Sequence, residues 1–264
     1  LPKLAQQGFQ RAVYCTPPSA DLADIILRDA AHIQMEDAAF KRKRHRKERR
    51  RGKHPEIPLY TDEDAAAALS LLRPVPYGQS VQVTDSMAVT FYDAGHILGS
   101  AMLELILHEN GRSRRLLFSG DVGQWHKPLM RDPTLFDQAD YVIMESTYGN
   151  RDHEHNGDVE TQLCDVINRT VSRGGSIVIP VFAVERAQEL MYHISRLVYS
   201  DRIPNIQIFL DSPMAVDVTQ IFRRHRDCFD DETWERIDSN QPPLQFEGLQ
   251  MVRSLEASKA INAI

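Results

Sequence analysis

The spacing of the apolar runs changes near residue 150, and this change constrains the fold of the 264-residue chain more than any other feature. Before residue 150, short runs typical of β-strands follow one another closely, and Asn110 and Gly111 between two of them predict a hairpin turn. These strands are predicted at 80–84, 88–92, 101–107, 115–118 and 141–144.

After residue 150, segments with helical periodicity alternate with apolar runs. Helices are predicted at 159–171, 185–199 and 215–224, with strands at 176–180 and 206–210. Fully apolar strands that alternate with helices favour a parallel sheet covered on both faces. The sequence therefore predicts an α/β chain with one domain over residues 1–149 and a second domain over residues 150–264.

A basic tract lies between Lys41 and His54, in a chain whose net charge is −6. The tract holds ten Lys or Arg residues and one acid. A long helix predicted to begin near Ser19 runs toward the tract, which has no apolar stripe to bury and should be exposed to solvent. Such cations, Lys43 and Arg46 among them, can neutralise RNA phosphates. A solvated loop and a nuclear-localisation patch are the alternatives.

Several classes of protein are excluded by the composition. The chain has no run of about 18 apolar residues, so no segment is expected to span a membrane. The first residues lack the pattern of a secretory signal, and the three cysteines form no C-x-x-C pair. These features predict a protein of the reducing cytoplasm, or of the nucleus in a eukaryote. Leu1 in place of an initiator Met suggests that the chain begins inside a longer reading frame.

Three polar residues stand at or near the ends of predicted strands. His96 lies on a glycine-flanked loop between two strands, and Asp121 and Glu145 follow apolar runs. Taken singly, a loop histidine is more often a surface residue, and Asp121 can equally cap a turn. Taken together, the three side chains should converge on one edge of a sheet. Imidazole and carboxylate groups there are suitable ligands for metal ions, and a carboxylate can bridge two of them.

Six segments, in this order, resemble the β-CASP branch of the metallo-β-lactamase superfamily, which consists of zinc-dependent nucleases that process RNA. The segments are 93–100 (DAGHILGS), 119–121 (SGD), 145–149 (ESTYG), 180–190 (PVFAVERAQEL), 210–215 (LDSPMA) and 256–262 (EASKAIN). The resemblance covers nearly the whole chain. It implies a partial metallo-β-lactamase αβ/βα core over residues 1–149 and a Rossmann-like β-CASP domain over residues 150–264.

The resemblance also implies roles for individual residues. His96 is similar to a ligand of one zinc ion, and Asp121 is similar to the catalytic carboxylate that bridges two zinc ions. Glu145 resembles the catalytic acid that helps to protonate the leaving group. Weaker contacts with the substrate are implied for Ser119, Thr147, Tyr148, Arg186 and Ser212. Arg186 has bracing of the domain interface as its alternative role, and Ser212 has capping of the next helix.

The chain departs from the family pattern in several places. The family's His-x-His-x-Asp-His motif would precede Leu1, and its two later histidine motifs would follow Ile264. Only two of the expected ligands are present, whereas a zinc site usually needs at least three from the protein. Other histidines do not complete the set: His153 and His155 lack the following Asp-His pair, and His126 is more readily a surface residue. Glu185 stands where family members commonly have a glycine before the arginine.

These observations predict a parent protein that binds two zinc ions and cleaves RNA, either endonucleolytically or from the 5' end. The 264-residue chain by itself is expected to be inactive. The main alternative is a non-catalytic RNA-binding or scaffolding relative, although retention of His96, Asp121 and Glu145 argues against it. A DNA substrate, a homodimer and partners in a processing complex remain open. The β-CASP segments argue against a small-molecule hydrolase.

Overall fold

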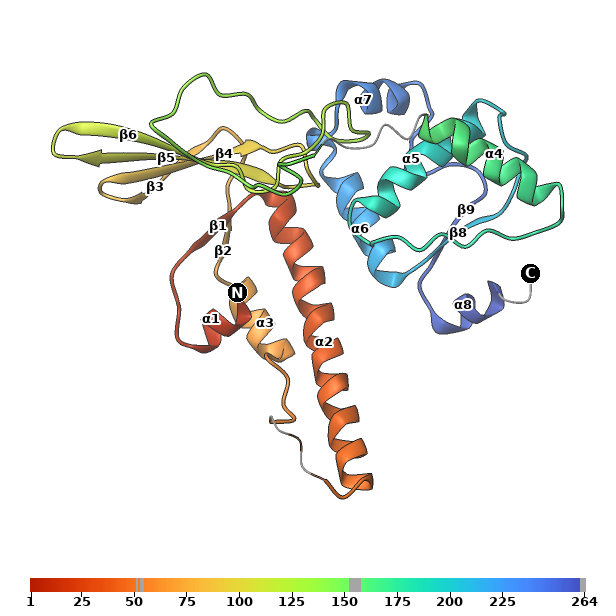
Figure 1. Cartoon of the computed structure of the whole chain (residues 1–264), viewed down its shortest axis with the longest axis horizontal. Helices are drawn as coiled ribbons and strands as arrows, with labels where there is room; N and C mark the ends of the chain where they lie inside the picture. Colours follow the sequence, from red (N-terminus) through yellow and green to blue (C-terminus); the bar gives the residue numbers. More distant parts are fainter. Residues whose placement is uncertain (51, 53–54, 152–157, 262–264) are drawn as a thin grey trace. The chain divides into compact units, whose positions relative to one another are not determined.

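The computed structural model describes residues 1–50, 52, 55–151 and 158–261 (Figure 1). Two compact units divide the chain, Leu1–Pro76 and Tyr77–Ile264. Helices and strands occur in both units, which confirms the predicted α/β class. The domain boundary predicted at residues 149 and 150 falls inside the second unit and stays a prediction. Within the described ranges, no helix is both long and apolar enough to cross a membrane.

The first unit is dominated by one long helix. Its elements are α1 (Pro2–Gln6), β1 (Val13–Cys15), α2 (Pro17–Lys47), α3 (Asp62–Leu69) and β2 (Leu72–Pro74), with β1 parallel to β2. The helix predicted from Ser19 begins earlier, because the Thr16 side chain accepts a hydrogen bond from the Ser19 N–H and caps α2. Pro17 and Pro18 fit the first turn of α2, because backbone N–H groups in the first turn of a helix have no acceptor within the helix.

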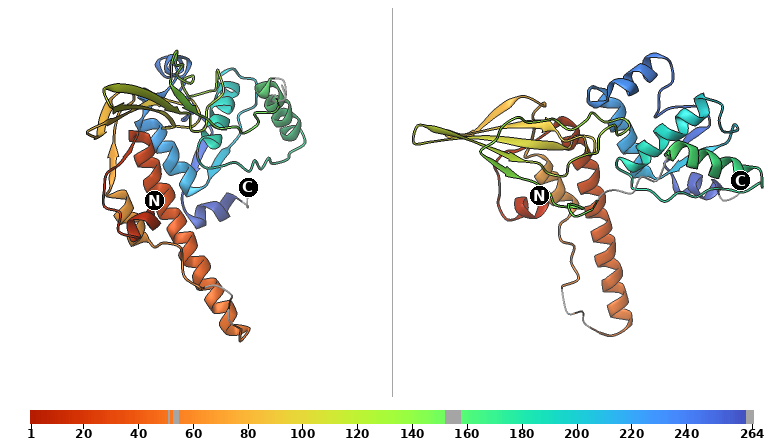
Figure 2. Two further views of the ribbon diagram at one scale, coloured as in Figure 1. Left: turned by 60° about the vertical axis from the view of Figure 1, so that its left-hand side comes forward. Right: turned by 45° about the horizontal axis from the view of Figure 1, so that its top comes forward.

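The basic tract begins in the last two turns of α2, which Figure 2 shows as one uninterrupted helix. Cations at this end of a helix interact favourably with the helix dipole. Two residues that follow the tract contact α2: Glu56 pairs with His45, and the Leu59 N–H donates a hydrogen bond to Gln34 Oε1. Lys43 and Arg46 are exposed, as predicted for the tract. His54 and part of the tract lie outside the described residues.

A five-stranded sheet opens the second unit. Its strands are β3 (Ser80–Thr84), β4 (Met87–Asp93), β5 (Ala101–Glu109), β6 (Arg112–Phe118) and β7 (Tyr141–Ile143), in that spatial order. Neighbouring strands are antiparallel except β6 and β7, which are parallel. The predicted hairpin is confirmed at Asn110 and Gly111, whose φ values of 50° and 74° suit a tight two-residue turn. The strand predictions for this part are confirmed to within a few residues.

Helices predominate after the sheet. The elements are α4 (Val159–Val171), α5 (Arg186–Tyr199), β8 (Ile208–Asp211), α6 (Pro213–Arg224), a 3-10 turn (Arg226–Cys228), α7 (Asp231–Asp238), β9 (Leu249–Val252) and α8 (Leu255–Ile261). The predicted helices are confirmed, and β8 and β9 form a parallel pair. The buried faces of α5 and α6 supply large core side chains, including Tyr192, Leu197 and Phe222.

The strand predicted at 176–180 is wrong. This segment has no ladder partner, and its Val178 side chain is 91% exposed. An apolar run becomes a strand only when a neighbour satisfies its backbone groups, and β8 pairs with β9 instead. The apolar pattern therefore identified strand-forming residues without identifying a partner for them.

Candidate active site

The topology of the sheet brings three loops to one edge. Because β4 and β6 are both antiparallel to β5, they run in the same direction, and β7 runs parallel to β6. The carboxyl ends of β4, β6 and β7 therefore meet at the same edge. His96 follows β4, Asp121 follows β6 and Glu145 follows β7. The predicted convergence of these three residues follows directly from this arrangement.

The loop that carries His96 is held by its own side chains. Asp93 Oδ1 accepts a hydrogen bond of 2.9 Å from the Gly95 N–H. Ser100 Oγ accepts bonds from the N–H groups of His96 and Ile97 at 3.1 and 3.3 Å. Gly95 has a φ of 62°, a conformation that glycine adopts without strain. The loop is therefore closed tightly, and the His96 side chain remains 42% exposed at its tip.

The Asp121 loop packs directly against the His96 loop. The Gly123 N–H donates to the Ala94 carbonyl at 2.8 Å. A Cβ at Gly123 would lie 1.7 Å from the Gly95 carbonyl oxygen, so only glycine fits at this approach. Asp121 Oδ2 lies 4.0 Å from His96 Nε2. The two loops thus place an imidazole nitrogen and a carboxylate oxygen side by side at an accessible edge.

Glu145 is tied to the same loop. Its Oε1 accepts a hydrogen bond of 2.7 Å from the Val122 N–H, next to Asp121. Its own N–H donates to Ser119 Oγ at 3.2 Å. Ser119 is buried and holds the Glu145 backbone, a contact that does not require substrate. The Val122 N–H therefore fixes the carboxylate of Glu145 beside Asp121, and Ser119 fixes the Glu145 backbone.

The other predicted substrate contacts lie in different settings. The Ser212 side chain accepts from the Ala215 N–H and caps α6, as its alternative role predicted. Arg186 is exposed and forms an ion pair of 2.8 Å with Glu189 on the same helix. Tyr148 has a φ of 57°, and the Arg151 guanidinium lies 4.2 Å from its ring centroid. Thr147, beside it, is exposed. Their contacts with a substrate stay predictions.

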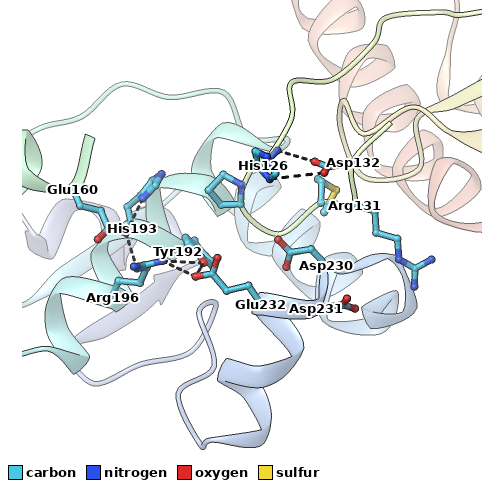
Figure 3. Close-up of a pocket in the computed structure, with 12 residues that line it drawn as sticks. His126, Arg131, Asp132, Glu160, Tyr192, His193, Arg196, Asp230, Asp231 and Glu232 are labelled. Carbon is cyan, nitrogen blue, oxygen red and sulfur yellow. Dashed lines mark hydrogen bonds and ion pairs between the residues drawn. The ribbon is translucent and has the colours of Figure 1, made fainter. Parts of the chain in front are cut away.

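A cavity of about 610 Å³ lies elsewhere in the second unit (Figure 3). The segment before residue 133 and helices α5 and α7 line it, and His126 is among its residues, whereas His96, Asp121 and Glu145 are not. Its polar groups pair with one another: Arg196 lies 2.7 Å from Glu160 and 2.6 Å from Glu232. Burial raises the pKa of Tyr192, which donates to Glu232, to about 12. These groups form an internal network.

The donor set at the sheet edge is incomplete for a metal ion. His96 and Asp121 are two suitable donors, but zinc in proteins takes at least three protein ligands. In the part of the chain that the structure describes, no three His, Cys, Asp or Glu side chains are placed to hold one ion. His153 and His155 lie outside the described residues. The residues present therefore do not by themselves fit a bound zinc.

Sequence reasoning missed one buried pair that contacts the His96 loop. Lys127 Nζ lies 3.2 Å from Glu185 Oε1, and their side chains are 12% and 2% exposed. Burial raises the pKa of the Glu185 carboxyl, while the neighbouring Lys127 opposes that change. Glu185 in place of a glycine was the only signal in the sequence, and nothing local to Lys127 indicated its partner.

Comparison with known proteins identifies relatives along nearly the whole chain. Residues 187–264 match the Beta-Casp domain model. The chain is 34% identical over 262 residues to ribonuclease TTHA0252 of Thermus thermophilus, covering 99% of this chain and 54% of the relative. It is 30% identical over 266 residues to transcription termination factor FttA of Methanosarcina mazei, covering 99% of this chain and 38% of the relative.

A third relative is endoribonuclease YSH1 of Saccharomyces cerevisiae, which is 28% identical over 265 residues, with 97% of this chain and 32% of the relative covered. The chain thus spans about half the length of TTHA0252 and about a third of the other two relatives. The domain match and these long alignments agree with the ordered strand-end residues of the sheet. The chain belongs to the β-CASP family of the metallo-β-lactamase superfamily, whose members generally use metal ions.

Proposed function

We propose that these residues belong to a metal-dependent ribonuclease that hydrolyses RNA phosphodiester bonds. The observation that carries the proposal is the placement of His96, Asp121 and Glu145 at the carboxyl ends of three strands that share one edge. The names of two relatives, a ribonuclease and an endoribonuclease, support it.

In this proposal His96 and Asp121 supply two ligands of a zinc centre, and two zinc ions bind the complete protein. An imidazole nitrogen and a carboxylate oxygen are both common zinc ligands, which supports the assignment. Among the described residues, no third ligand lies at this edge. A polypeptide limited to residues 1–264 should therefore be inactive.

Glu145 is proposed as an acid that gives a proton to the departing oxygen of the RNA. General acids must lie within hydrogen-bond reach of the group that they protonate. The Val122 N–H fixes one carboxylate oxygen of Glu145 close to Asp121. This bond keeps the carboxyl group at the edge where the proposed ligands lie, which supports its role near the scissile bond.

RNA is the proposed substrate, and the end of α2 is proposed to contact its phosphates. The last turn of α2 carries Arg44, His45, Arg46 and Lys47, with Lys43 just before it. Exposed cations gain affinity for nucleic acid by releasing counterions from phosphates, and this affinity does not depend on the nucleotide sequence. The tract therefore supplies affinity, while the strand-end residues supply chemistry.

The proposal is tested with the polypeptide as its own cell makes it, using end-labelled RNA with and without a chelator. His96→Ala and Asp121→Ala should each lower cleavage by at least about a hundredfold, since even outer-shell partners of metal ligands change activity by up to that factor. Glu247→Gln, which removes an exposed carboxylate, is the matched control and should leave cleavage unchanged.

Full cleavage by both variants would contradict the proposal, because it would remove His96 and Asp121 from the reaction. Efficient, chelator-sensitive cleavage by residues 1–264 alone would contradict only their expected inactivity, and it would show that further residues of this polypeptide complete the ligand set.

A further inference from the structure

Glu185 occupies a backbone conformation that residues other than glycine seldom adopt. Its φ and ψ are 68° and −59°, and the Arg186 N–H donates to the Val184 carbonyl at 2.9 Å across it. These values describe a classic γ-turn, which is rare and strained. Strained residues persist only where their surroundings hold them, and they concentrate at functional sites. We therefore expect the contacts of the Glu185 side chain to hold this strained turn in place.

The Glu185 side chain reaches into the loop that carries His96. Its Oε2 accepts a hydrogen bond of 3.1 Å from the Leu98 N–H. Its Oε1 lies 3.2 Å from Lys127 Nζ, and that ammonium donates to the His96 carbonyl at 2.6 Å. The buried pair thus holds two backbone groups of one loop, at residues 96 and 98.

The turn itself is anchored to the helices behind it. The Gln188 side chain, fully buried on α5, donates to the Ala183 carbonyl at 3.2 Å and to Thr219 Oγ1 of α6 at 2.9 Å. On its other side the His96 loop packs against Gly123. The loop is therefore fixed between the Asp121 loop and the start of α5.

We propose that Glu185, with Lys127, is a positioning residue that fixes His96 beside Asp121 from the start of α5. In this strained turn the carboxylate is directed at the Leu98 N–H and Lys127. The effect of this positioning on RNA cleavage rests on the proposed function, whereas its effect on the His96 loop does not. Stability alone is a weak reason for such a pair, because buried ion pairs often stabilise less than apolar residues of similar size.

Amide hydrogen exchange on the 264-residue chain tests the positioning directly. In Glu185→Gly the amides of His96 and Ile97, which donate to Ser100 and not to Glu185, should exchange faster by at least about tenfold as the loop opens locally. Amides in the middle of β5 should keep their rates. Glu247→Gln is the matched control and should change neither set.

Two further variants separate positioning from general destabilisation. Glu185→Gln keeps an acceptor for the Leu98 N–H and should restore part of the loop protection. The double variant Glu185→Gly with Lys127→Met leaves no buried charge unpaired, so it should fold even where a single variant fails. It should show the same fast exchange at His96 and Ile97. Unchanged loop exchange in a folded variant without the Glu185 carboxylate would overturn the proposal, and so would equal acceleration throughout β5.

Kinetics on the polypeptide as its own cell makes it provide an independent readout. Glu185→Gly should lower kcat by about tenfold or more with little change in KM, because misplacing a reacting group by a small distance acts mainly on the chemical step. A kcat that stays at the wild-type value would overturn the catalytic consequence. A wild-type protein that cleaves no RNA would contradict the proposed function, while the exchange rates alone decide whether Glu185 positions the loop.

Discussion

At the scale of single residues, the sheet edge that carries His96 and Asp121 depends on a close approach of two loops at Gly123. Gly123 lets two loops approach until its amide reaches the Ala94 carbonyl at 2.8 Å. Glu145 and Ser119 then join the end of β7 to the Asp121 loop through backbone donors. The Asp121 loop is thus held beside the His96 loop by bonds from backbone N–H groups, two of which are accepted by the side chains of Glu145 and Ser119.

Gly123→Ala should therefore open this edge. The new Cβ would meet the Gly95 carbonyl at 1.7 Å, and overpacking of this kind costs about 1–3 kcal/mol or more. Urea unfolding should show this loss in the free energy of unfolding. Gly175→Ala is the control, because its Cβ would lie 3.1 Å from the Thr170 side chain, which can yield. Equal stability of the two variants would contradict the close approach at Gly123.

Sequence reasoning reached some of these residues and missed others for a physical reason. His96, Asp121 and Glu145 were found together because each follows a strand, and strand ends are visible in a sequence. Lys127 was missed because its partner Glu185 is distant in sequence and meets it only through tertiary packing. The Ser119 hydroxyl also accepts a hydrogen bond from the Glu145 backbone, a contact that no local pattern reveals, and its contact with substrate stays a prediction.

At the scale of elements, α4 begins at a charged cap. Asp158 accepts bonds from the Thr161 hydroxyl and the Glu160 N–H. The Thr161 hydrogen bond is the main cause that lowers the pKa of Asp158. An acid whose pKa is lower in the folded state stabilises the fold above its unfolded pKa, and this contribution disappears as the pH falls through the folded pKa.

Asp158→Asn should therefore lower stability at neutral pH and lose that effect in acid. The difference between wild type and variant in urea midpoint should shrink as the pH falls below about 4, the usual value for Asp. Asp201→Asn, at an exposed position, serves as the control and is measured over the same pH range. A difference that grows in acid would contradict the lowered pKa.

The end of α2 is an element with a separate electrostatic role in the proposal. Replacing Lys43 and Arg46 together by Gln should weaken RNA binding on all sequences equally. Each lost contact with single-stranded RNA should reduce the slope of log affinity against log salt by about 0.7. Arg28→Gln on the same helix is the control, because Arg28 already pairs with Asp24 at 2.8 Å. An unchanged slope in the double variant would show that the tract does not contact phosphate.

At the scale of the whole molecule, the order of elements could be predicted better than their pairing. The strands of the five-stranded sheet were predicted from their apolar runs, and the pairing of β5 with β6 followed from the short turn at Asn110 and Gly111. The segment 176–180 has the same apolar character, yet it forms no strand among the described residues. Burial and strand pairing depend on the tertiary neighbours of a segment, and the composition of the segment does not reveal those neighbours.

The incomplete ligand set leads to a prediction about metal content. Among the described residues, this edge offers His96 and Asp121, whose Nε2 and Oδ2 atoms lie 4.0 Å apart, and a zinc site usually needs at least three protein ligands. Residues 1–264 are therefore expected to lose zinc on dialysis. The polypeptide as its own cell makes it should retain about two zinc ions per chain, as in other two-metal hydrolases.

Zinc content is compared by elemental analysis of both polypeptides after the same dialysis, and Asp121→Ala in the polypeptide as its own cell makes it should lose zinc. Retention of no zinc by that polypeptide would favour a non-catalytic RNA-binding relative. Stable zinc on residues 1–264 would instead show that this edge is completed by ligands other than His96 and Asp121 alone. The nuclease proposal therefore depends on zinc that is held by the complete protein and lost when Asp121 is removed.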